Sequence, residues 1–222
     1  VMETSLHREL KSLYADDSQQ IEVSWGDYRI DAIAQDWLIE IQHGSLAAIR
    51  DKVRCLVQDH QVLVVKPIIA SKRLVKRKKK DGPVVDRRKS PKRGCLLNLF
   101  DELVYFTEVF PHPNLAIEAV LVDVEEWRYP GHGRRRYRRD NDFQVEDLKL
   151  LAVRNSCRIA EATDLWKLLP RIKMKCPFHT GELASRLKTE RGIAQRIAYV
   201  MRETSALKQV GKRGNALLYS YN

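Results

Sequence analysis

The sequence has no apolar run of the about 20 residues that a membrane-spanning helix needs. No secretory signal opens it, and its four cysteines lie far apart without forming a C-x-x-C pair. These absences argue against a membrane protein, a zinc site and a disulfide-stabilised secreted domain. We therefore expect a cytoplasmic protein with reduced thiols and no membrane partner.

Negative charge is also in short supply. The 222 residues include 40 Lys and Arg against 29 Asp and Glu, for a formal net charge of +11. Such a surplus favours an anionic partner, with nucleic acid ahead of a membrane surface. At 44% hydrophobic residues, the chain can still bury a substantial core, in one large domain or two small ones.

Residues 27–45 carry the most informative pattern, and they read DYRIDAIAQDWLIEIQHGS. Two alternating runs flank a two-residue loop, which predicts a β-hairpin that pairs Ile33 with Leu38 and Asp31 with Glu40. The two carboxylates would then face each other with Cβ atoms roughly 5 Å apart. Like charges placed so destabilise a sheet, and a divalent cation such as Mg²⁺ or Mn²⁺ would offset their repulsion. In a second interpretation, both acids lie at the solvent edge and pair with Arg29 or Lys52.

The elements around this hairpin predict an α/β core. We expect a helix near residues 2–15, a strand at 21–25, a helix at 45–60 and a strand at 61–69. The last segment, QVLVVKPII, is apolar throughout, as in a strand buried on both faces. A strand, a helix and a buried strand in succession make a parallel crossover. The predicted order is therefore αβββαβ, with a mixed sheet.

Two basic insertions follow the predicted core. Residues 71–93 should form a β-hairpin that turns at Asp81-Gly82. The second insertion, residues 128–142, joins strands expected at 115–127 and 143–153, and its sequence GHGRRRYRRDN suits contacts with nucleic-acid phosphates. Its candidate DNA-binding residues are Arg134, Arg135, Arg136, Arg138 and Arg139.

The last fifty residues predict a separate unit. A helix capped by Thr180, a second helix near 190–204 and a β-hairpin at 206–221 together resemble a winged-helix domain. We place the domain boundary between residues 1–156 and 157–222. The side chains expected to contact DNA from this unit are Gln195, Arg196, Tyr199 and Arg202 of the second helix, and Lys212 and Arg213 of the hairpin tip.

Asp31, Glu40 and Gln42 in an αβββαβ setting resemble the PD-(D/E)XK (restriction-endonuclease-like) nuclease superfamily in its D…E-x-Q form. The resemblance covers about residues 1–70, and it implies that Asp31 and Glu40 bind Mg²⁺ while Gln42 positions the attacking water. Resolvase-like members add a metal-binding Glu from the first helix, a role that Glu3 matches best and Glu9 second. The joint layout with a C-terminal winged helix is also similar to a group of bacterial nuclease-like proteins.

Gln42 departs from the commoner lysine of this motif. A lysine would bring positive charge to the developing transition state, whereas a neutral amide can only orient water or phosphate. Some restriction enzymes of the superfamily carry Gln at this position. His7 lies one turn after Glu3 and His43 directly follows the motif, and each is interpreted as structural before catalytic.

The sequence thus predicts a metal-dependent DNA endonuclease acting on double-stranded or branched DNA. The alternative is a catalytically inactive nuclease-fold protein that binds DNA in a regulatory role, and an RNA-processing nuclease is a third reading. A second copy of the chain is a candidate partner.

Overall fold

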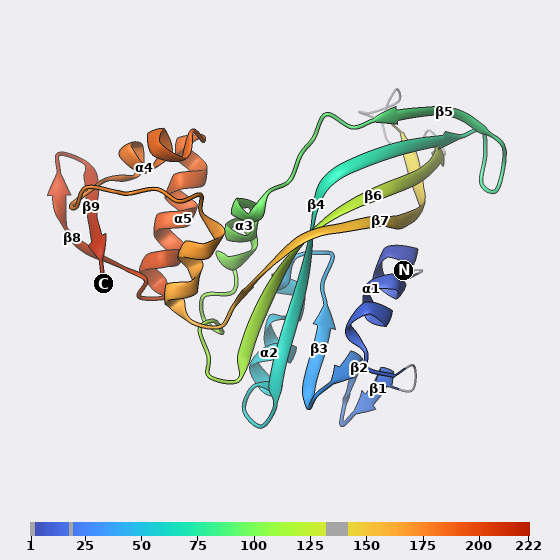
Figure 1. The fold of residues 1–222 in the computed structure, drawn as a ribbon, viewed down its shortest axis with the longest axis horizontal. Helices are drawn as coiled ribbons and strands as arrows, with labels where there is room; N and C mark the ends of the chain where they lie inside the picture. Colours follow the sequence, from blue (N-terminus) through green and yellow to red (C-terminus); the bar gives the residue numbers. More distant parts are fainter. Residues whose placement is uncertain (1–2, 18–19, 132–141) are drawn as a thin grey trace.

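A computed structural model describes residues 3–17, 20–131 and 142–222. Figure 1 shows a curved sheet with helices on both faces and a smaller unit at one end. The elements of the sheet region are α1 (Ser5–Tyr14), β1 (Ile21–Trp25), β2 (Tyr28–Ala34), β3 (Trp37–Ile41), η2 (Leu46–Ile49), α2 (Arg50–Leu56), β4 (Gln61–Arg77), β5 (Val84–Lys89), η3 (Leu96–Asn98), α3 (Leu99–Leu103), β6 (Leu115–Pro130) and β7 (Phe143–Ile159).

The sheet is mixed, as predicted. Its strands follow the order β1-β2-β3-β4-β6-β7, and β5 pairs with the far part of β4. The β3–β4 and β4–β6 pairs are parallel, whereas the remaining pairs of the sheet are antiparallel. The α/β class and the predicted order of one helix, three strands, a helix and a strand are confirmed.

Helices cover the two faces of the sheet unequally. On one face, α1 buries Leu6 and Leu10 against a cluster that includes Ile39, Val65 and Val124. On the other face, α2 and α3 share a larger cluster with the C-terminal unit. The alternation of the strand residues directs successive side chains into these two clusters.

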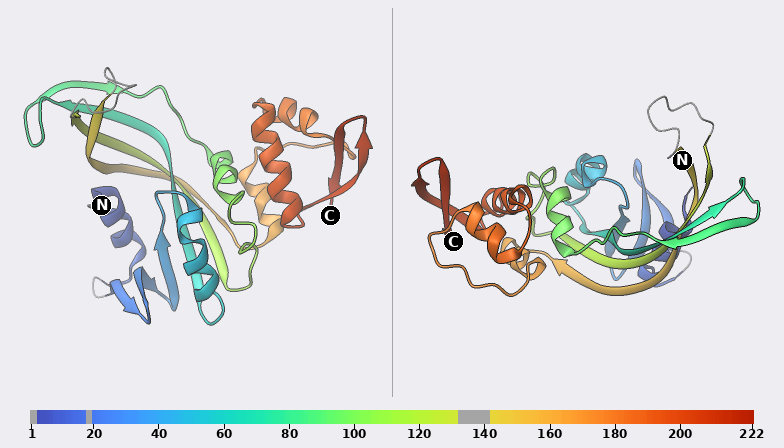
Figure 2. Two further views of the ribbon diagram at one scale, coloured as in Figure 1. Left: turned by 180° about the vertical axis from the view of Figure 1, so that it is seen from behind. Right: turned by 90° about the horizontal axis from the view of Figure 1, so that it is seen from above.

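Strand β4 is longer than predicted. It was expected to end at Ile69, but it continues through a register shift near Ala70 into the basic section and ends at Arg77. The predicted hairpin of the basic section is confirmed, because β5 pairs with this far part of β4 across a turn at residues 78–83. We call the parts of these strands beyond the register shift, residues 71–77 of β4, 123–130 of β6 and 143–152 of β7, together with β5, the arm (Figure 2).

Pro67 lies inside β4 without interrupting it. The backbone of Val65 faces β3, since its carbonyl accepts from the N–H of Gln42, and Pro67 faces the same side two residues later. The β3 pairing ends at Val65, so no partner strand needs the N–H that proline lacks.

The C-terminal unit contains η5 (Ala162–Leu168), α4 (Thr180–Leu187), α5 (Arg191–Glu203), β8 (Leu207–Arg213) and β9 (Ala216–Tyr221). The two helices and the hairpin agree with the prediction, but the cap of α4 does not. His179 caps α4, because its Nδ1 accepts from the N–H groups of Gly181 and Glu182. Strand β7 continues to Ile159, so the expected boundary after residue 156 falls inside a strand.

Among the helices in the described part of the chain, none is long and apolar enough to cross a membrane.

Candidate functional site: a charged cleft beside the central hairpin

The central hairpin has the predicted register up to the acidic residues. Ala34 pairs with Trp37, Ile33 with Leu38 and Ala32 with Ile39, and the pairing ends there. Beyond this point, Oδ2 of Asp31 accepts a hydrogen bond from the N–H of Ile41 at 2.8 Å. The side chain of Asp31 thus takes the place of a main-chain partner, and the predicted pairing of Asp31 with Glu40 is replaced by this contact.

Asp31 also faces His7 of helix α1. His7 Nε2 lies 3.2 Å from Asp31 Oδ2 and 3.0 Å from the carbonyl oxygen of Ile41. The bond to Asp31 raises the pKa of His7 above its ordinary value. Burial works to raise the pKa of Asp31, but the hydrogen bonds from His7 and Ile41 outweigh burial and lower it. Asp31 is therefore held as a carboxylate.

Lys11 brings three carboxylates together. Its Nζ lies 2.5 Å from Glu3 Oε1, 2.5 Å from Glu22 Oε1 and 3.8 Å from Asp31 Oδ1, and its side chain is only 3% exposed. Burial tends to lower the pKa of Lys11, and the bonds to Glu22 and Glu3 more than offset that effect. The ammonium group thus stays charged among these acids.

Neither Lys11 nor Glu22 was predicted from the sequence. Lys11 follows His7 by four residues, which places both on one face of α1, and Glu3 lies four residues before His7, just ahead of the helix. This spacing was a usable signal. Glu22 reaches Lys11 from β1 with φ of +56°, a left-handed conformation that is rare for a residue with a side chain. No sequence pattern predicted that backbone conformation.

Glu40 has a different partner. Its Oε1 lies 2.5 Å from Nζ of Lys52 in α2, and its side chain is 6% exposed. Lys52 also donates to the carbonyl oxygen of Arg29 at 2.6 Å. Burial raises the pKa of Glu40, although Lys52 acts in the opposite direction. The pairing with Lys52 agrees with the second sequence interpretation, but its solvent-edge location is wrong because Glu40 is buried.

Gln42 is fixed at the end of β3. Its N–H bonds to the carbonyl oxygen of Val65 at 2.9 Å, and its side-chain Nε2 donates to the carbonyl oxygen of Ser45 at 2.7 Å. The loop after it is tied down by the buried ammonium of Lys66, which donates to the carbonyl oxygens of His43 and Gly44. Gln42 is therefore presented in one orientation.

These side chains surround a cleft of about 510 Å³. Its lining residues are Glu3, Thr4, His7, Lys11, Glu22, Arg29, Asp31, Ile41, Gln42, His43 and Gly44. Of the predicted catalytic residues, Glu3, Asp31 and Gln42 line the cleft, whereas Glu40 is buried against Lys52. Of the two candidate glutamates, Glu3 lies just before α1 and reaches the cleft, whereas Glu9 is exposed on the helix itself.

Within the described ranges, no three His, Cys, Asp or Glu side chains are grouped closely enough to form a ready metal-binding set. The carboxylates are bound to lysine ammonium groups instead: Glu3 and Glu22 to Lys11, and Glu40 to Lys52.

In the C-terminal unit, three of the predicted DNA-contacting residues lie together. Gln195, Tyr199 and Arg202 line a hollow of about 320 Å³ between α5 and the β8–β9 hairpin. Arg196 points elsewhere, with its Nε 2.5 Å from Asp101 Oδ1 of α3. That ion pair is exposed and links α5 to α3, whereas the shared apolar cluster packs the C-terminal unit against the sheet region.

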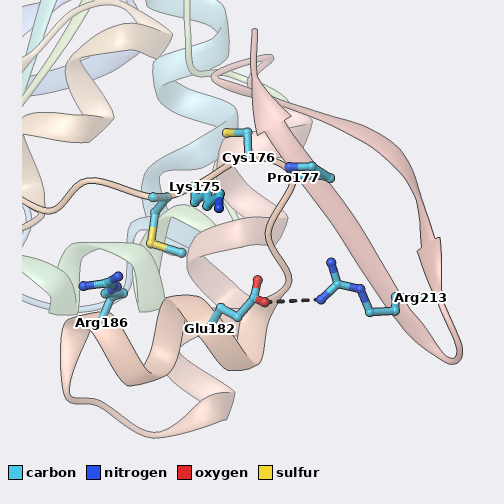
Figure 3. A pocket seen from close by; sticks show the side chains of 7 residues that line it. Lys175, Cys176, Pro177, Glu182, Arg186 and Arg213 are labelled. Atoms are coloured by element: carbon cyan, nitrogen blue, oxygen red, sulfur yellow. Dashed lines mark hydrogen bonds and ion pairs between the residues drawn. The ribbon is translucent and has the colours of Figure 1, made fainter.

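The two basic residues at the tip of the β8–β9 hairpin have different surroundings. Lys212 is exposed, whereas Arg213 lies 3.3 Å from Glu182 of α4. This pair lines a hollow of about 450 Å³. Figure 3 shows the pair with Lys175, Cys176 and Arg186, which line the same hollow. The predicted contacts at Arg134, Arg135, Arg136, Arg138 and Arg139 lie outside the described residues.

Comparison with known proteins adds a family. The model of the family described as "Domain of unknown function (DUF8091)" matches residues 4–160, which is most of the chain. The chain belongs to this family. The DUF8091 match includes α1, the whole seven-stranded sheet and every cleft residue except Glu3, and it ends one residue after β7.

The DUF8091 chain is also similar to an "Uncharacterized protein" of Treponema pallidum (strain Nichols). The two are 29% identical over 225 residues, which covers 98% of this chain and 84% of the relative. No solved structure matches the chain.

Proposed function

We propose that this protein is a metal-dependent DNA endonuclease whose sheet region is a restriction-endonuclease-like core of the PD-(D/E)XK type. The observation that carries the proposal is the meeting of Glu3, Asp31 and Gln42 at one cleft, where the pairing of β2 and β3 ends. The αβββαβ order of the core supports it. The proposed C-terminal winged helix rests on the succession of α4, α5 and the β8–β9 hairpin.

The donor chemistry of the cleft fits a hard cation. Oxygen atoms of Glu3, Glu22 and Asp31 already converge on one positive group, the Lys11 ammonium, and carboxylate oxygens are the ligands that Mg²⁺ and Mn²⁺ prefer. Asp31 and Glu3 would hold the ion from the cleft, and Glu40 on the neighbouring strand would join them once its carboxylate leaves Lys52. When bound, the ion would supply a water of lowered pKa and neutralise charge on the scissile phosphate.

The protein groups of the cleft have separable roles in this reaction. His7 and the N–H of Ile41 orient the Asp31 carboxylate. Since Gln42 donates its amide hydrogen to Ser45, its carbonyl oxygen can accept a hydrogen bond from the attacking water. Lys11 provides a buried positive charge in the same cleft, where the neutral Gln42 provides none.

Nicking of supercoiled plasmid tests this proposal. We expect nicking with Mg²⁺ or Mn²⁺ and none with excess chelator. Glu3→Gln should reduce nicking at least tenfold. Glu9→Gln is the matched control, because it removes the same charge from an exposed position of α1, six residues away and outside the cleft. Equal nicking by wild type, Glu3→Gln and Asp31→Asn would refute the assignment of the cleft.

A specific observation favours a second candidate, a catalytically inactive nuclease-fold protein that binds DNA in a regulatory role. The ammonium groups of Lys11 and Lys52 hold the carboxylates on which metal binding depends. If both metals leave plasmid, branched and single-stranded DNA intact while the protein binds duplex tightly, this second function replaces the first.

A further inference from the structure

The arm carries an arrangement of charges around one indole ring. Guanidinium and ammonium groups of three side chains lie near the ring of Trp127: Arg77 at 4.5 Å from the ring centre, Lys149 at 4.7 Å and Arg87 at 5.7 Å. They come from β4, β7 and β5, so the array spans the width of the arm. Trp127 itself lies on β6 and is partly exposed.

A buried carboxylate organises this array. Glu125 accepts a hydrogen bond from Trp127 Nε1 at 2.8 Å through one oxygen. Its other oxygen lies 3.6 Å from Arg73 and 3.7 Å from Arg87. Arg77 in turn lies 3.3 Å from Glu146. A third carboxylate, Asp81, lies 4.0 Å from Arg77. The surface defined by Trp127, Arg73, Arg77, Arg87 and Lys149, which we call the Trp127 face, therefore has four cations for three carboxylates.

The Trp127 face points away from the cleft. Val124 packs into the cluster that α1 covers, and side chains alternate along β6, so Glu125 and Trp127 project from the opposite side of the sheet. The cleft is lined by α1 residues and thus lies on the α1 side. One ligand segment bound in the cleft does not lie over the Trp127 face without bending around the sheet.

The geometry leaves hydrogen-bond donors available on this face. An arginine that stacks its flat side on an aromatic ring keeps the N–H groups at its edge free to bond phosphate oxygens in pairs. Arg73 and Arg87 are 56% and 54% exposed, and their distances from Glu125 exceed those of direct hydrogen bonds. An anionic ligand can therefore approach both guanidinium groups without displacing a tight ion pair.

We propose that the Trp127 face is a second nucleic-acid-binding surface, which contacts the phosphate backbone of a segment other than the one in the cleft. A row of cations from three strands, on both sides of Trp127, suits a polyanion with regularly spaced charges. This inference does not rest on cleavage at the cleft, and it holds for an active or an inactive protein.

The test measures affinity for a fluorescently labelled 20-base-pair duplex by anisotropy, in chelator and in an Asp31→Asn background, so that no cleavage contributes. Arg73→Ala/Arg87→Ala should weaken binding about tenfold at low salt. Loss of two phosphate contacts should lower the slope of log affinity against log salt by about 1.8. The matched control, Arg8→Ala/Lys167→Ala, removes the same charge from exposed positions of α1 and η5 and should leave the slope unchanged.

Trp127 fluorescence separates contact from a merely structural role. Duplex should quench wild-type emission more than that of Trp127→Phe, whose ring retains the stacking of the cations and whose affinity should stay within about threefold of wild type. Trp127→Leu should bind as weakly as the arginine double variant while keeping the wild-type circular dichroism spectrum. Equal salt slopes for the arginine variant and its control, or identical quenching in wild type and Trp127→Phe, would overturn the proposal.

Discussion

The pair formed by Glu40 and Lys52 offers a direct test of the electrostatics beneath the cleft. Lys52→Met would remove the ammonium that lies 2.5 Å from a carboxylate with a 6% exposed side chain. Breaking a buried ion pair by deleting one partner costs about 3–5 kcal/mol. Lys52 is itself 20% exposed, so water partly compensates and we expect the lower end, about 3 kcal/mol. For a domain of this size, that corresponds to a fall in Tm of about 6–12 °C.

The cost should depend on pH in a defined direction. Burial already raises the pKa of Glu40 above 4.5, and removal of Lys52 removes an influence that lowers it. Between 4.5 and the raised value, the folded state retains a proton that the unfolded state releases, so the stability of the variant falls as pH rises. The loss in free energy of unfolding caused by Lys52→Met should therefore be smaller at pH 5 than at pH 8.

Urea denaturation of a double-mutant cycle measures the pair. Glu40→Leu/Lys52→Met removes both charges and should return to within about 1 kcal/mol of wild type. Arg54→Met is the control on the same helix, because its ion pairs with Asp51 and Glu108 are exposed and contribute at most about 1 kcal/mol. If Lys52→Met costs the same in the Glu40→Leu background and at both pH values, the ion pair does not determine stability and the reasoning fails.

Three further outcomes follow from the cleft and from α5. Asp31 raises the pKa of His7, so the stabilisation from their bond is fully present below pH 6.5 and is lost as pH rises through the raised pKa. In Asp31→Asn, an NMR titration should show a lower pKa for His7, and an unchanged pKa would contradict the contact. Gln42→Ala should slow plasmid nicking by about 10²-fold, the loss of one positioned hydrogen-bonding group, while Gln42→Lys retains or increases it; equal rates for all three proteins would exclude a role for position 42. Tyr199→Ala should weaken duplex binding at least threefold by anisotropy without a change in Tm, because the side chain is 39% exposed in the hollow beside β8–β9; unchanged affinity would exclude that hollow.

The hairpin could be predicted from the sequence because its information is local. Alternation assigns each side chain to a face, and a two-residue loop sets the register, so the pairs from Ala34–Trp37 onward were correct. Local rules then failed at Asp31, where the strands separate and a side chain replaces the main-chain partner. Pairing rules assume a continuous ladder and do not predict where it ends.

The rest of the cleft depends on contacts between distant parts of the chain. Glu22 meets Lys11 through an unusual backbone conformation, and Lys52 reaches Glu40 because the crossover helix packs on that side of the sheet. The packing of the C-terminal unit was equally hidden, because Arg196 and Asp101 are 95 residues apart in the sequence. This unit shares one apolar cluster with the sheet region, so its removal would expose core side chains of both parts.

Strand β4 connects the two proposed binding surfaces at a set spacing. Val64 pairs with Glu40 next to the cleft, and Val75 pairs with Trp127 on the arm. At about 3.3 Å per residue, the strand between them is at most about 36 Å long. This is close to one turn of B-DNA, about 34–36 Å. Apart from the register shift at Ala70, β4 is hydrogen-bonded to β6 along this stretch, and this pairing fixes the spacing. A nucleic acid held at both surfaces must therefore pass from one face of the sheet to the other within about ten base pairs. This requirement favours a bent duplex, a branched molecule or two separate segments over one straight duplex.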